Sequence, residues 1–315
     1  ELPHAAVNAT LRERALALGY NEAVSLTFIS HANAERFSSV SVLEVENPLS
    51  EEASVMRTSM APGMLDMLAW NLNRDSENVR LFEMGRIYEM PSAEQVEPAR
   101  ACLGATFEAV RSSLPVGAAL DVSKGEHAVA AEAFRSFKGD VENLLSAFGC
   151  GELSFDRETA EYFHPGRSAR VLMHATVVAQ FGQIAESVKA ERKLRQDVFL
   201  AEIDLEQLHG IGLRAVRFAP LGKYPAVERD FSFVFADKVL FVEMKKAVAN
   251  LDIAELRHFH PVEIFRGGSI VPGKYSILLR ARLQSDEGTL RDEQIAQWSE
   301  KIVASLRGLG GVQRA

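Results

Sequence analysis

Two side chains near the C-terminal end of the chain could hold an unstacked nucleic-acid base. Glu263 and Phe265 are two positions apart in the run 262–265, whose apolar residues predict a β-strand, so both side chains lie on one side of the sheet. An aromatic ring can stack on a base, and a carboxylate can accept hydrogen bonds from the Watson–Crick N–H groups of guanine. In the alternative interpretation, Phe265 is an ordinary packed strand residue and Glu263 is a solvated charge.

The next predicted strand, 275–283, carries polar side chains that suit the same task. Ser276 could offer a hydroxyl to a base edge, and Arg280 and Arg282 could contact phosphates, because Lys and Arg follow the backbone of single-stranded RNA. Residues 223–315 hold 14 Lys and Arg against 12 Asp and Glu, whereas residues 1–222 hold 21 against 31. A mildly basic segment beside an acidic one suggests a nucleic-acid partner for the basic part.

Other candidate residues favour structural roles. His258 and His260 share a face of a possible strand, but no carboxylate or cysteine at ligand spacing accompanies them, so we predict no metal site. His164 precedes a proline in a predicted loop and has no identifiable nucleophile as a partner, which favours a structural or solvent-facing histidine. The run 166–168, Gly-Arg-Ser, could bind an anion through turn N–H groups, although short glycine turns of this kind are common.

The elements that must position Glu263 and Phe265 follow a regular order. In residues 223–315 the apolar spacing predicts a βαββαβ arrangement, with a strand at 231–235, a helix at 241–251, strands at 262–265 and 275–283, a helix opened by a capping box at Thr289 and Asp292, and a last strand at 312–314. This is the ferredoxin-like plan, a four-stranded antiparallel sheet with two helices on one face. The other face of the sheet is then open to a ligand.

The preceding part of the chain reads as a separate α+β domain. Its pattern predicts helices at 7–18, from Pro62 to 73, and at 137–148, strands at 24–29, 79–88, 101–107, 169–173, 177–182 and 198–203, and irregular stretches at 91–98, 111–127 and 164–168. The stripe of Val7, Leu11 and Leu18 on the first helix could face the core or a partner subunit. We place the domains at 1–205 and 223–315, with a linker at 206–222.

Composition excludes several classes of protein. The chain has 315 residues, 47% of them hydrophobic and 25% charged, which is typical of a soluble protein with two globular domains. No apolar run approaches the roughly 20 residues that span a bilayer. Cys102 and Cys150 form no C-x-x-C pair, which favours a reducing compartment such as the cytoplasm. Because the chain begins at Glu1 and its first methionine is Met56, we expect it to be part of a longer protein.

Several runs, in collinear order along the chain, resemble the β subunit of bacterial phenylalanyl-tRNA synthetase. In the first domain they are 47–52 (Asn-Pro-Leu-Ser-Glu-Glu), 56–59 (Met-Arg-Thr-Ser), 62–65 (Pro-Gly-Met-Leu), 79–86 (Val-Arg-Leu-Phe-Glu-Met-Gly-Arg), 138–142 (Lys-Gly-Asp-Val-Glu) and 163–169 (Phe-His-Pro-Gly-Arg-Ser-Ala). In the second domain they are 224–231 (Tyr-Pro-Ala-Val-Glu-Arg-Asp-Phe), 265–267 (Phe-Arg-Gly) and 289–293 (Thr-Leu-Arg-Asp-Glu).

The resemblance implies a fold and a function for each domain. Residues 1–205 would form a catalytic-like class II synthetase domain, an antiparallel sheet with flanking helices that scaffolds the catalytic α subunit. Residues 223–315 would form a ferredoxin-fold anticodon-binding domain. The implied partners are the α subunit, in a heterotetramer of two α and two β subunits, and the tRNA for phenylalanine. ATP and Mg²⁺ would bind at the α subunit, and this chain would hold no cofactor and no metal.

The anticodon binding that the resemblance implies would fall on the residues identified above from their types and spacing. These are Glu263, Phe265, Ser276, Arg280 and Arg282. The family more often shows Asp and Tyr where this chain has Glu263 and Phe265.

One family motif is incomplete in this chain. The third class II motif, a glycine-rich strand leading into a helix that begins Glu-Arg, should fall at 181–187, but Glu186 is followed by Ser187 and the next arginine is Arg192. Activation of an amino acid with ATP needs fixed cations at the phosphates. We therefore predict no catalytic residue in this chain. Two alternatives stay open, a stand-alone ATP-dependent ligase and a protein-interaction scaffold without RNA affinity.

Overall fold

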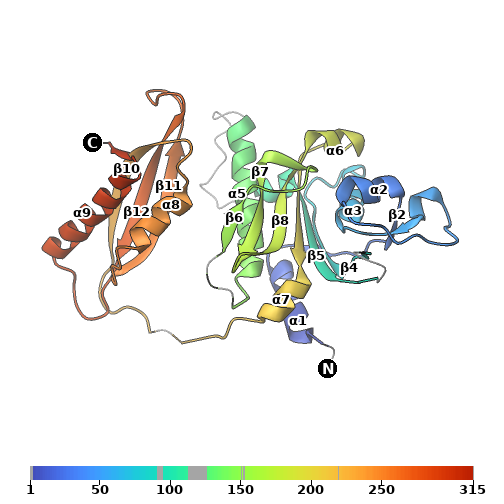
Figure 1. Cartoon of the computed structure of the whole chain (residues 1–315), viewed down its shortest axis with the longest axis horizontal. Helices are drawn as coiled ribbons and strands as arrows, with labels where there is room; N and C mark the ends of the chain where they lie inside the picture. Colours follow the sequence, from blue (N-terminus) through green and yellow to red (C-terminus); the bar gives the residue numbers. More distant parts are fainter. Residues whose placement is uncertain are drawn as a thin grey trace. The chain divides into compact units, whose positions relative to one another are not determined.

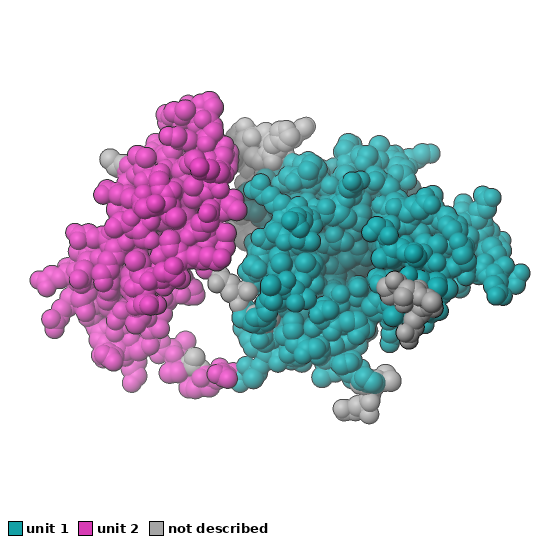
Figure 2. Space-filling view, viewed as in Figure 1, with its two compact units in different colours: residues 1–216 teal, residues 217–315 magenta. Residues whose placement is uncertain are grey.

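The computed structural model of the chain describes residues 3–90, 95–112, 126–149, 151, 153–218 and 220–314. The chain divides into two compact units, Glu1–Val216 and Arg217–Ala315, called unit 1 and unit 2 below (Figure 2). Cys150 and parts of the predicted irregular stretches 91–98 and 111–127 lie outside the described residues. Within the described residues, no helix has the length and apolar character needed to cross a membrane.

Unit 1 is built on a seven-stranded sheet in the order β1-β4-β5-β9-β8-β7-β6 (Figure 1). The strands are β1 Asn21–Glu22, β4 Arg80–Arg86, β5 Ala99–Thr106, β6 Ser154–Asp156, β7 Phe163–Met173, β8 Thr176–Ile184 and β9 Val198–Asp204. Neighbouring strands are antiparallel, except that β1 runs parallel to β4. The predicted α+β class is confirmed, and the predicted antiparallel sheet has one parallel pair at its edge.

Helices cover both faces of this sheet, because successive side chains of its central strands are apolar and point to opposite faces. On β9, Phe199 and Ala201 pack with α1 (Ala5–Ala17) and α5 (Glu126–Leu145). The intervening Leu200 packs on the other face with α3 (Ala61–Leu72). A strand buried on both faces forms the centre of a three-layer core. The predicted helix at Pro62 is confirmed, with the proline in the first turn, where its missing N–H costs no hydrogen bond.

Short elements surround the sheet. They are α2 His31–Phe37, the antiparallel pair β2 Phe28–Ile29 and β3 Val55–Met56, the 3₁₀ turn η1 Glu51–Ala53, α4 Phe107–Ser112, α6 Glu186–Glu191 and α7 Leu205–Ile211. Helix α7 occupies the first residues of the predicted linker 206–222. Its N-terminus is capped by Asp204, whose side chain accepts a hydrogen bond from the Gln207 backbone N–H at 3.1 Å.

Two predictions for unit 1 are wrong in local structure. The predicted strand 24–29 is strand only at its end, and Val24 and Leu26 are 86% and 76% exposed. The predicted loop 164–168 belongs to β7. Pro165 is tolerated there because β6 pairs only with residues 170–172 of β7, and because the register with β8 shifts between Phe163 and Ser168 and gives residues 164–167 no partner. Helix α5 also begins earlier than the predicted 137–148.

Unit 2 has the predicted βαββαβ order. Its elements are β10 Val227–Ala236, α8 Phe241–Ala249, β11 Leu256–Phe265, β12 Lys274–Leu283, α9 Asp292–Gly308 and β13 Val312–Gln313, and the sheet order is β11-β12-β10-β13 (Figure 1). Neighbouring strands are antiparallel. The core lies on one side of the sheet, where Phe231, Phe233 and Phe235 of β10 pack against α8 and α9. The ferredoxin-like prediction is therefore confirmed.

The C-terminal part of unit 2 depends on two local features. Helix α9 begins at Asp292 with Arg291 as its N-cap residue, and the Gln294 side chain accepts from the Arg291 backbone N–H at 3.1 Å. The predicted capping box at Thr289 is therefore wrong. Gly311 follows α9, and a β-carbon there would lie 2.6 Å from the Phe235 ring and 2.7 Å from the Leu306 carbonyl oxygen. Only glycine lets the chain return this closely to the core.

Candidate nucleic-acid interface

The sheet of unit 2 has one face that α8 and α9 leave uncovered, called the open face below. Its register pairs His258 with Arg282, His260 with Arg280, Glu263 with Leu278 and Phe265 with Ser276. Residues paired directly across two strands point to the same side of a sheet. The neighbouring residues Phe259 of β11 and Ile277 of β12 point to the other side, where they are buried in the core. All five residues predicted from the sequence therefore share the open face.

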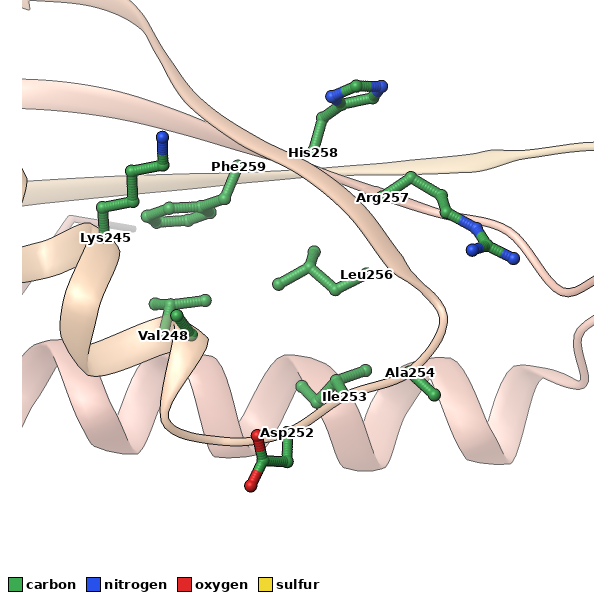
Figure 3. Close-up of a pocket in the computed structure, with 10 residues that line it drawn as sticks. Lys245, Val248, Asp252, Ile253, Ala254, Leu256, Arg257, His258 and Phe259 are labelled. Carbon is green, nitrogen blue, oxygen red and sulfur yellow. The ribbon is translucent and has the colours of Figure 1, made fainter. Parts of the chain in front are cut away.

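A register shift in β11 makes this arrangement possible. The shift lies between Pro261 and Glu263, so β11 carries one extra residue opposite β12. Strict alternation would place His260 and Glu263 on opposite faces, and the extra residue restores both to the open face. Figure 3 shows the beginning of this strand, where His258 and Phe259 point to opposite sides.

Phe265 is the aromatic side chain that the open face presents. It is 48% exposed, whereas the core phenylalanines of the same sheet are at most 9% exposed. The chain turns directly after it through Gly267 and Gly268, both with positive φ. A β-carbon at Gly268 would lie 3.4 Å from Cζ of Phe265, so the ring rests against this glycine turn. Phe265 is therefore not part of the core of unit 2, and its stacking role stays a prediction.

Arg280 is engaged by carboxylates of the neighbouring strand. Its Nε and Nη2 donate to the two oxygens of Asp230 at 2.7 and 2.8 Å, and its Nη1 lies 3.2 Å from Glu228. Hydrogen bonds from Arg280 lower the pKa of Asp230, and the same contacts raise the pKa of Arg280. A phosphate would have to compete with two carboxylates for this guanidinium.

Arg282 and Glu263 are more accessible. Both are exposed, and Arg282 lies between His258 and Glu228 in the strand register. Arg282 makes no ion pair within the part of the chain that the structure describes. A guanidinium without a carboxylate partner keeps its charge and donors for a phosphate.

Ser276 is held by a residue that the sequence did not single out. The Ser276 side chain lies on the open face but is only 6% exposed, and its hydroxyl accepts a hydrogen bond from Nη1 of Arg314 at 3.2 Å. Arg314 follows the last strand, β13, which pairs with β10. From the sequence, strand alternation predicts only that Val312 and Arg314 share one face. It does not show that β13 joins β10, and without that pairing the contact with Ser276 cannot be predicted.

A groove on the helix side of β11 is not a second stacking site. It has a volume of about 390 Å³ and an apolar lining from Val248, Leu256 and Phe259 (Figure 3). Phe259 is 9% exposed. Arg257, at one end of the groove, donates to the Gln284 carbonyl oxygen at 3.0 Å and to Asp286 at 2.6 Å. Among the described residues, the groove thus offers neither an exposed Phe, Tyr or Trp ring nor an unengaged guanidinium.

The histidines of the sequence stand in polar surroundings. His258 and His260 lie beside Arg282 and Arg280, and among the described residues no group of three or more His, Cys, Asp or Glu is placed to hold a metal ion. Nδ1 of His164 accepts from the Gly166 backbone N–H at 3.0 Å. This turn N–H is therefore used within the chain and is not open to an anion.

Unit 1 has a polar cavity on its sheet between β5, β8 and β9. The cavity has a volume of about 230 Å³, and its lining includes Glu89, Glu202, Asp204 and Arg100. Arg100 lies 3.0 Å from Asp204 and 4.0 Å from Glu89. It is the only Lys or Arg among the described residues that line the cavity. An acidic lining with one paired cation is a poor match for a triphosphate.

The carboxylate of Glu202 serves the packing around this cavity. It accepts from the Ser59 hydroxyl at 2.9 Å, from the Met60 backbone N–H at 2.8 Å and from the Tyr162 hydroxyl at 2.7 Å. Burial raises the pKa of Tyr162 well above its usual value, and the charge of Glu202 adds to the shift. These bonds join β9 to the beginning of α3 and to the segment before β7.

The region of the incomplete third motif has a structural arginine. Strand β8 leads into α6 as predicted, and Arg192 lies directly after that helix. Its guanidinium contacts Asn33 and Asp66 and lies 3.3 Å from the Pro62 carbonyl oxygen. Arg192 therefore ties α6 to α2 and α3.

Comparisons with known proteins concern nearly the whole chain. A family model described as the phenylalanyl-tRNA synthetase beta chain CLM domain matches residues 1–205, and one described as a ferredoxin-fold anticodon binding domain matches residues 222–314. The chain is 27% identical over 310 residues to the phenylalanine–tRNA ligase beta subunit of Geobacter sulfurreducens, covering 96% of this chain and 38% of that protein. It is also 27% identical over 292 residues to the beta subunit from Legionella pneumophila strain Paris, covering 92% and 35%.

The chain spans little more than a third of the length of these curated relatives. Among solved structures, pyrrolysyl-tRNA synthetase from Desulfitobacterium hafniense aligns with 64% of this chain and 67% of that chain, with a TM-score of 0.47 and 14% identity.

Proposed function

Because the chain belongs to the family of phenylalanyl-tRNA synthetase β chains, we propose that it forms the anticodon-binding and scaffolding part of a phenylalanine–tRNA ligase. Unit 2 binds the anticodon of the tRNA for phenylalanine on its open face. Unit 1 supports a catalytic α subunit, which binds ATP and Mg²⁺ and attaches phenylalanine to the tRNA. The complete enzyme contains two α and two β subunits in the cytoplasm.

The observation that carries the anticodon proposal is the exposed ring of Phe265 on the open face, where Glu263, Arg280 and Arg282 lie as well. A ring that is 48% exposed can stack on a splayed anticodon base, as aromatic side chains do in single-stranded RNA recognition. Glu263 lies two residues away on the same face and can accept from a base edge. Arg282, on the neighbouring strand, can contact phosphate, whereas Arg280 has to leave Asp230 first.

The scaffolding proposal is supported by an apolar surface on unit 1. Leu26, Phe28 and Trp70 are 76%, 42% and 56% exposed, and they line a cavity of about 930 Å³ between the β2 region and α3. Exposed apolar patches on soluble proteins mark interaction sites. The stripe on α1 is not part of this surface, because Val7 and Leu11 are buried against the core of unit 1.

Two measurements test the proposal. A filter-binding titration against the tRNA for phenylalanine and an unrelated tRNA should show tighter binding of the former, and equal affinity for both would contradict anticodon recognition. The chain alone should catalyse no phenylalanine-dependent pyrophosphate exchange with ATP. Exchange above a buffer control that is abolished by a point mutation in this chain would support a stand-alone ligase instead.

A further inference from the structure

Arg314 extends from the last strand across the sheet of unit 2. Its backbone N–H donates to the Ser232 carbonyl oxygen of β10 at 2.9 Å, which fixes the residue beside β10. Its Nη1 donates to Ser276 of β12 at 3.2 Å. The side chain therefore crosses β10 on the open face and ends above β12.

The end point of this side chain is next to Phe265. Ser276 is paired with Phe265 in the register of β11 and β12, and directly paired residues have β-carbons about 5 Å apart. The guanidinium of Arg314 thus contacts the residue that faces Phe265 directly across the two strands. We propose that Arg314 contacts a phosphate of the nucleotide whose base stacks on Phe265, and that Ser276 is the positioning residue that holds Arg314 there.

Charge pairing separates Arg314 from Arg280 and Arg266, two arginines of the same sheet and its turn, and groups it with Arg282. Arg280 is held by Asp230 and Glu228, and Arg266 by Asp237. Arg314 makes no ion pair within the described residues, and its hydrogen bond to Ser276 uses one of its five N–H donors. An exposed guanidinium with donors to spare beside a stacking ring can form a charge-assisted bond to phosphate.

The inference rests on the proposed anticodon binding and assigns a role to a residue outside the set predicted from the sequence. It also changes the role of Ser276. A hydroxyl that accepts from Arg314 and is 6% exposed orients the arginine and has little surface left for a base edge.

The test is a titration of the whole chain with the anticodon stem-loop of the phenylalanine tRNA at several salt concentrations. Arg314→Ala should weaken binding roughly ten- to a hundredfold, the usual range for a hydrogen bond to a charged group. It should also lower the magnitude of the log-log salt slope by about 0.7, the value for one single-strand phosphate contact. Arg314→Lys should keep the slope and lose part of the affinity, and Ser276→Ala should lose affinity less than Arg314→Ala.

Arg307→Ala is the matched control. Arg307 is an exposed arginine of the same C-terminal region, and its guanidinium bonds to the Gln313 side chain at 2.9 Å. Gln313 is paired with the buried Phe233 and so points to the helix side of the sheet. This variant should bind within twofold of the unmodified chain and keep its salt slope.

Two outcomes would overturn the inference, and they are distinguishable. If Arg314→Ala and Arg314→Lys keep the affinity and slope of the unmodified chain while Phe265→Ala weakens binding, Arg314 has no phosphate contact and the proposed anticodon binding survives. If Phe265→Ala also has no effect, the proposed function of the open face fails as well. Circular dichroism of each variant checks that the fold is kept, and the lysine variant decides the question if the alanine variant unfolds.

Discussion

The two units of the chain use arginine in different ways. In unit 1, Arg57 has a side chain that is 4% exposed, lies 2.8 Å from Glu83 and also contacts Ser25 and the Arg86 carbonyl oxygen. On the open face of unit 2, Arg282 and Arg314 are exposed and have no ion pair within the described residues. An arginine that completes a buried network cannot leave it without cost. Under the proposed function, pairing and not residue type distinguishes the arginines that can meet a phosphate, Arg282 and Arg314, from an arginine that holds unit 1 together, Arg57.

The largest expected effect comes from removing the buried arginine of unit 1. Arg57→Met leaves the carboxylate of Glu83, whose side chain is 3% exposed, without a cation. Removing one partner of a buried ion pair costs about 3–5 kcal/mol of unfolding free energy. Urea unfolding followed by circular dichroism measures the loss.

Arg12→Met is the control for this substitution. Arg12 forms a bidentate pair with Glu22, but the two side chains are 42% and 38% exposed. Exposed pairs contribute at most about 1 kcal/mol. If the Arg12 and Arg57 variants lose equal amounts of unfolding free energy, the burial of the Arg57 network does not matter for stability. The contrast between a structural arginine in unit 1 and available arginines in unit 2 would then fail.

The next effect concerns the apolar surface of unit 1. Leu26→Asp places a charge on a side chain that is 76% exposed, so the stability of the chain should hardly change. Binding of the α subunit should weaken at least about tenfold, because a charge in the centre of an apolar interface is left without a partner. Val216→Asp, at a fully exposed position outside the surface, should leave α binding intact. A pulldown that shows unchanged α binding for Leu26→Asp would move the interface elsewhere.

A smaller effect is expected when an acid is removed from the open face. Asp230→Asn takes away the bidentate partner of Arg280 and leaves only the contact with Glu228, so that guanidinium should become more available to phosphate. Binding to any tRNA should then tighten a few-fold, and the salt slope should steepen by about 0.7. Glu300→Gln on α9 also removes one negative charge from unit 2 and should change the affinity less. Equal effects from the two variants would indicate a general charge effect without a role for Arg280.

The smallest expected effect is a titration inside unit 1. His209 stacks on His4 with ring centroids 3.9 Å apart, and its Nε2 lies 3.0 Å from the Asn8 side chain. Burial lowers the pKa of His209, and the neighbouring His4 adds to the shift. His209 therefore binds a proton more readily in the unfolded chain than in the folded one. Its contribution to the free energy of unfolding is fully present above the unfolded pKa of about 6.5 and is lost as the pH falls from there toward the lower folded pKa.

NMR titration of His209 in the folded chain and in urea checks this shift. The pKa of His209 in the folded chain should be lower than the pKa in urea. The free energy of unfolding of His209→Gln should then fall less on acidification than that of the unmodified chain. A folded value equal to or above the value in urea would mean that His209 is not desolvated between α1 and α7.

The family and most of the elements could be predicted from the sequence because their signals are local. The helix stripe after Pro62 and the alternating phenylalanines at 231, 233 and 235 are confirmed, and the family inferred from the collinear motifs is confirmed by the matching family models. The strand predicted at 24–29 from the apolar residues Val24 and Leu26 is wrong over most of its length, because these side chains face outward and not into the core.

The composition of the open face could be predicted only in part. Spacing alone places Glu263 and Phe265 on one face, because strand alternation is a local property. The pairing of Arg280 with Asp230 depends on the register between β12 and β10, residues 50 positions apart. The contact between Arg314 and Ser276 depends on β13 joining the far edge of the sheet. A single sequence carries no direct signal for such long-range pairings.

The most direct test of the open face compares two neighbouring side chains. Phe265 and Ile264 are 48% and 55% exposed, but their partners in β12 place them on opposite faces of the sheet. In titrations with the anticodon stem-loop of the phenylalanine tRNA, Phe265→Ala should cost about 1–3 kcal/mol of binding, the usual contribution of one stacked base, and Ile264→Ala should leave the affinity within twofold. If both variants are folded and bind as tightly as the unmodified chain, or if Ile264→Ala causes the larger loss, the open face is not the anticodon-binding surface.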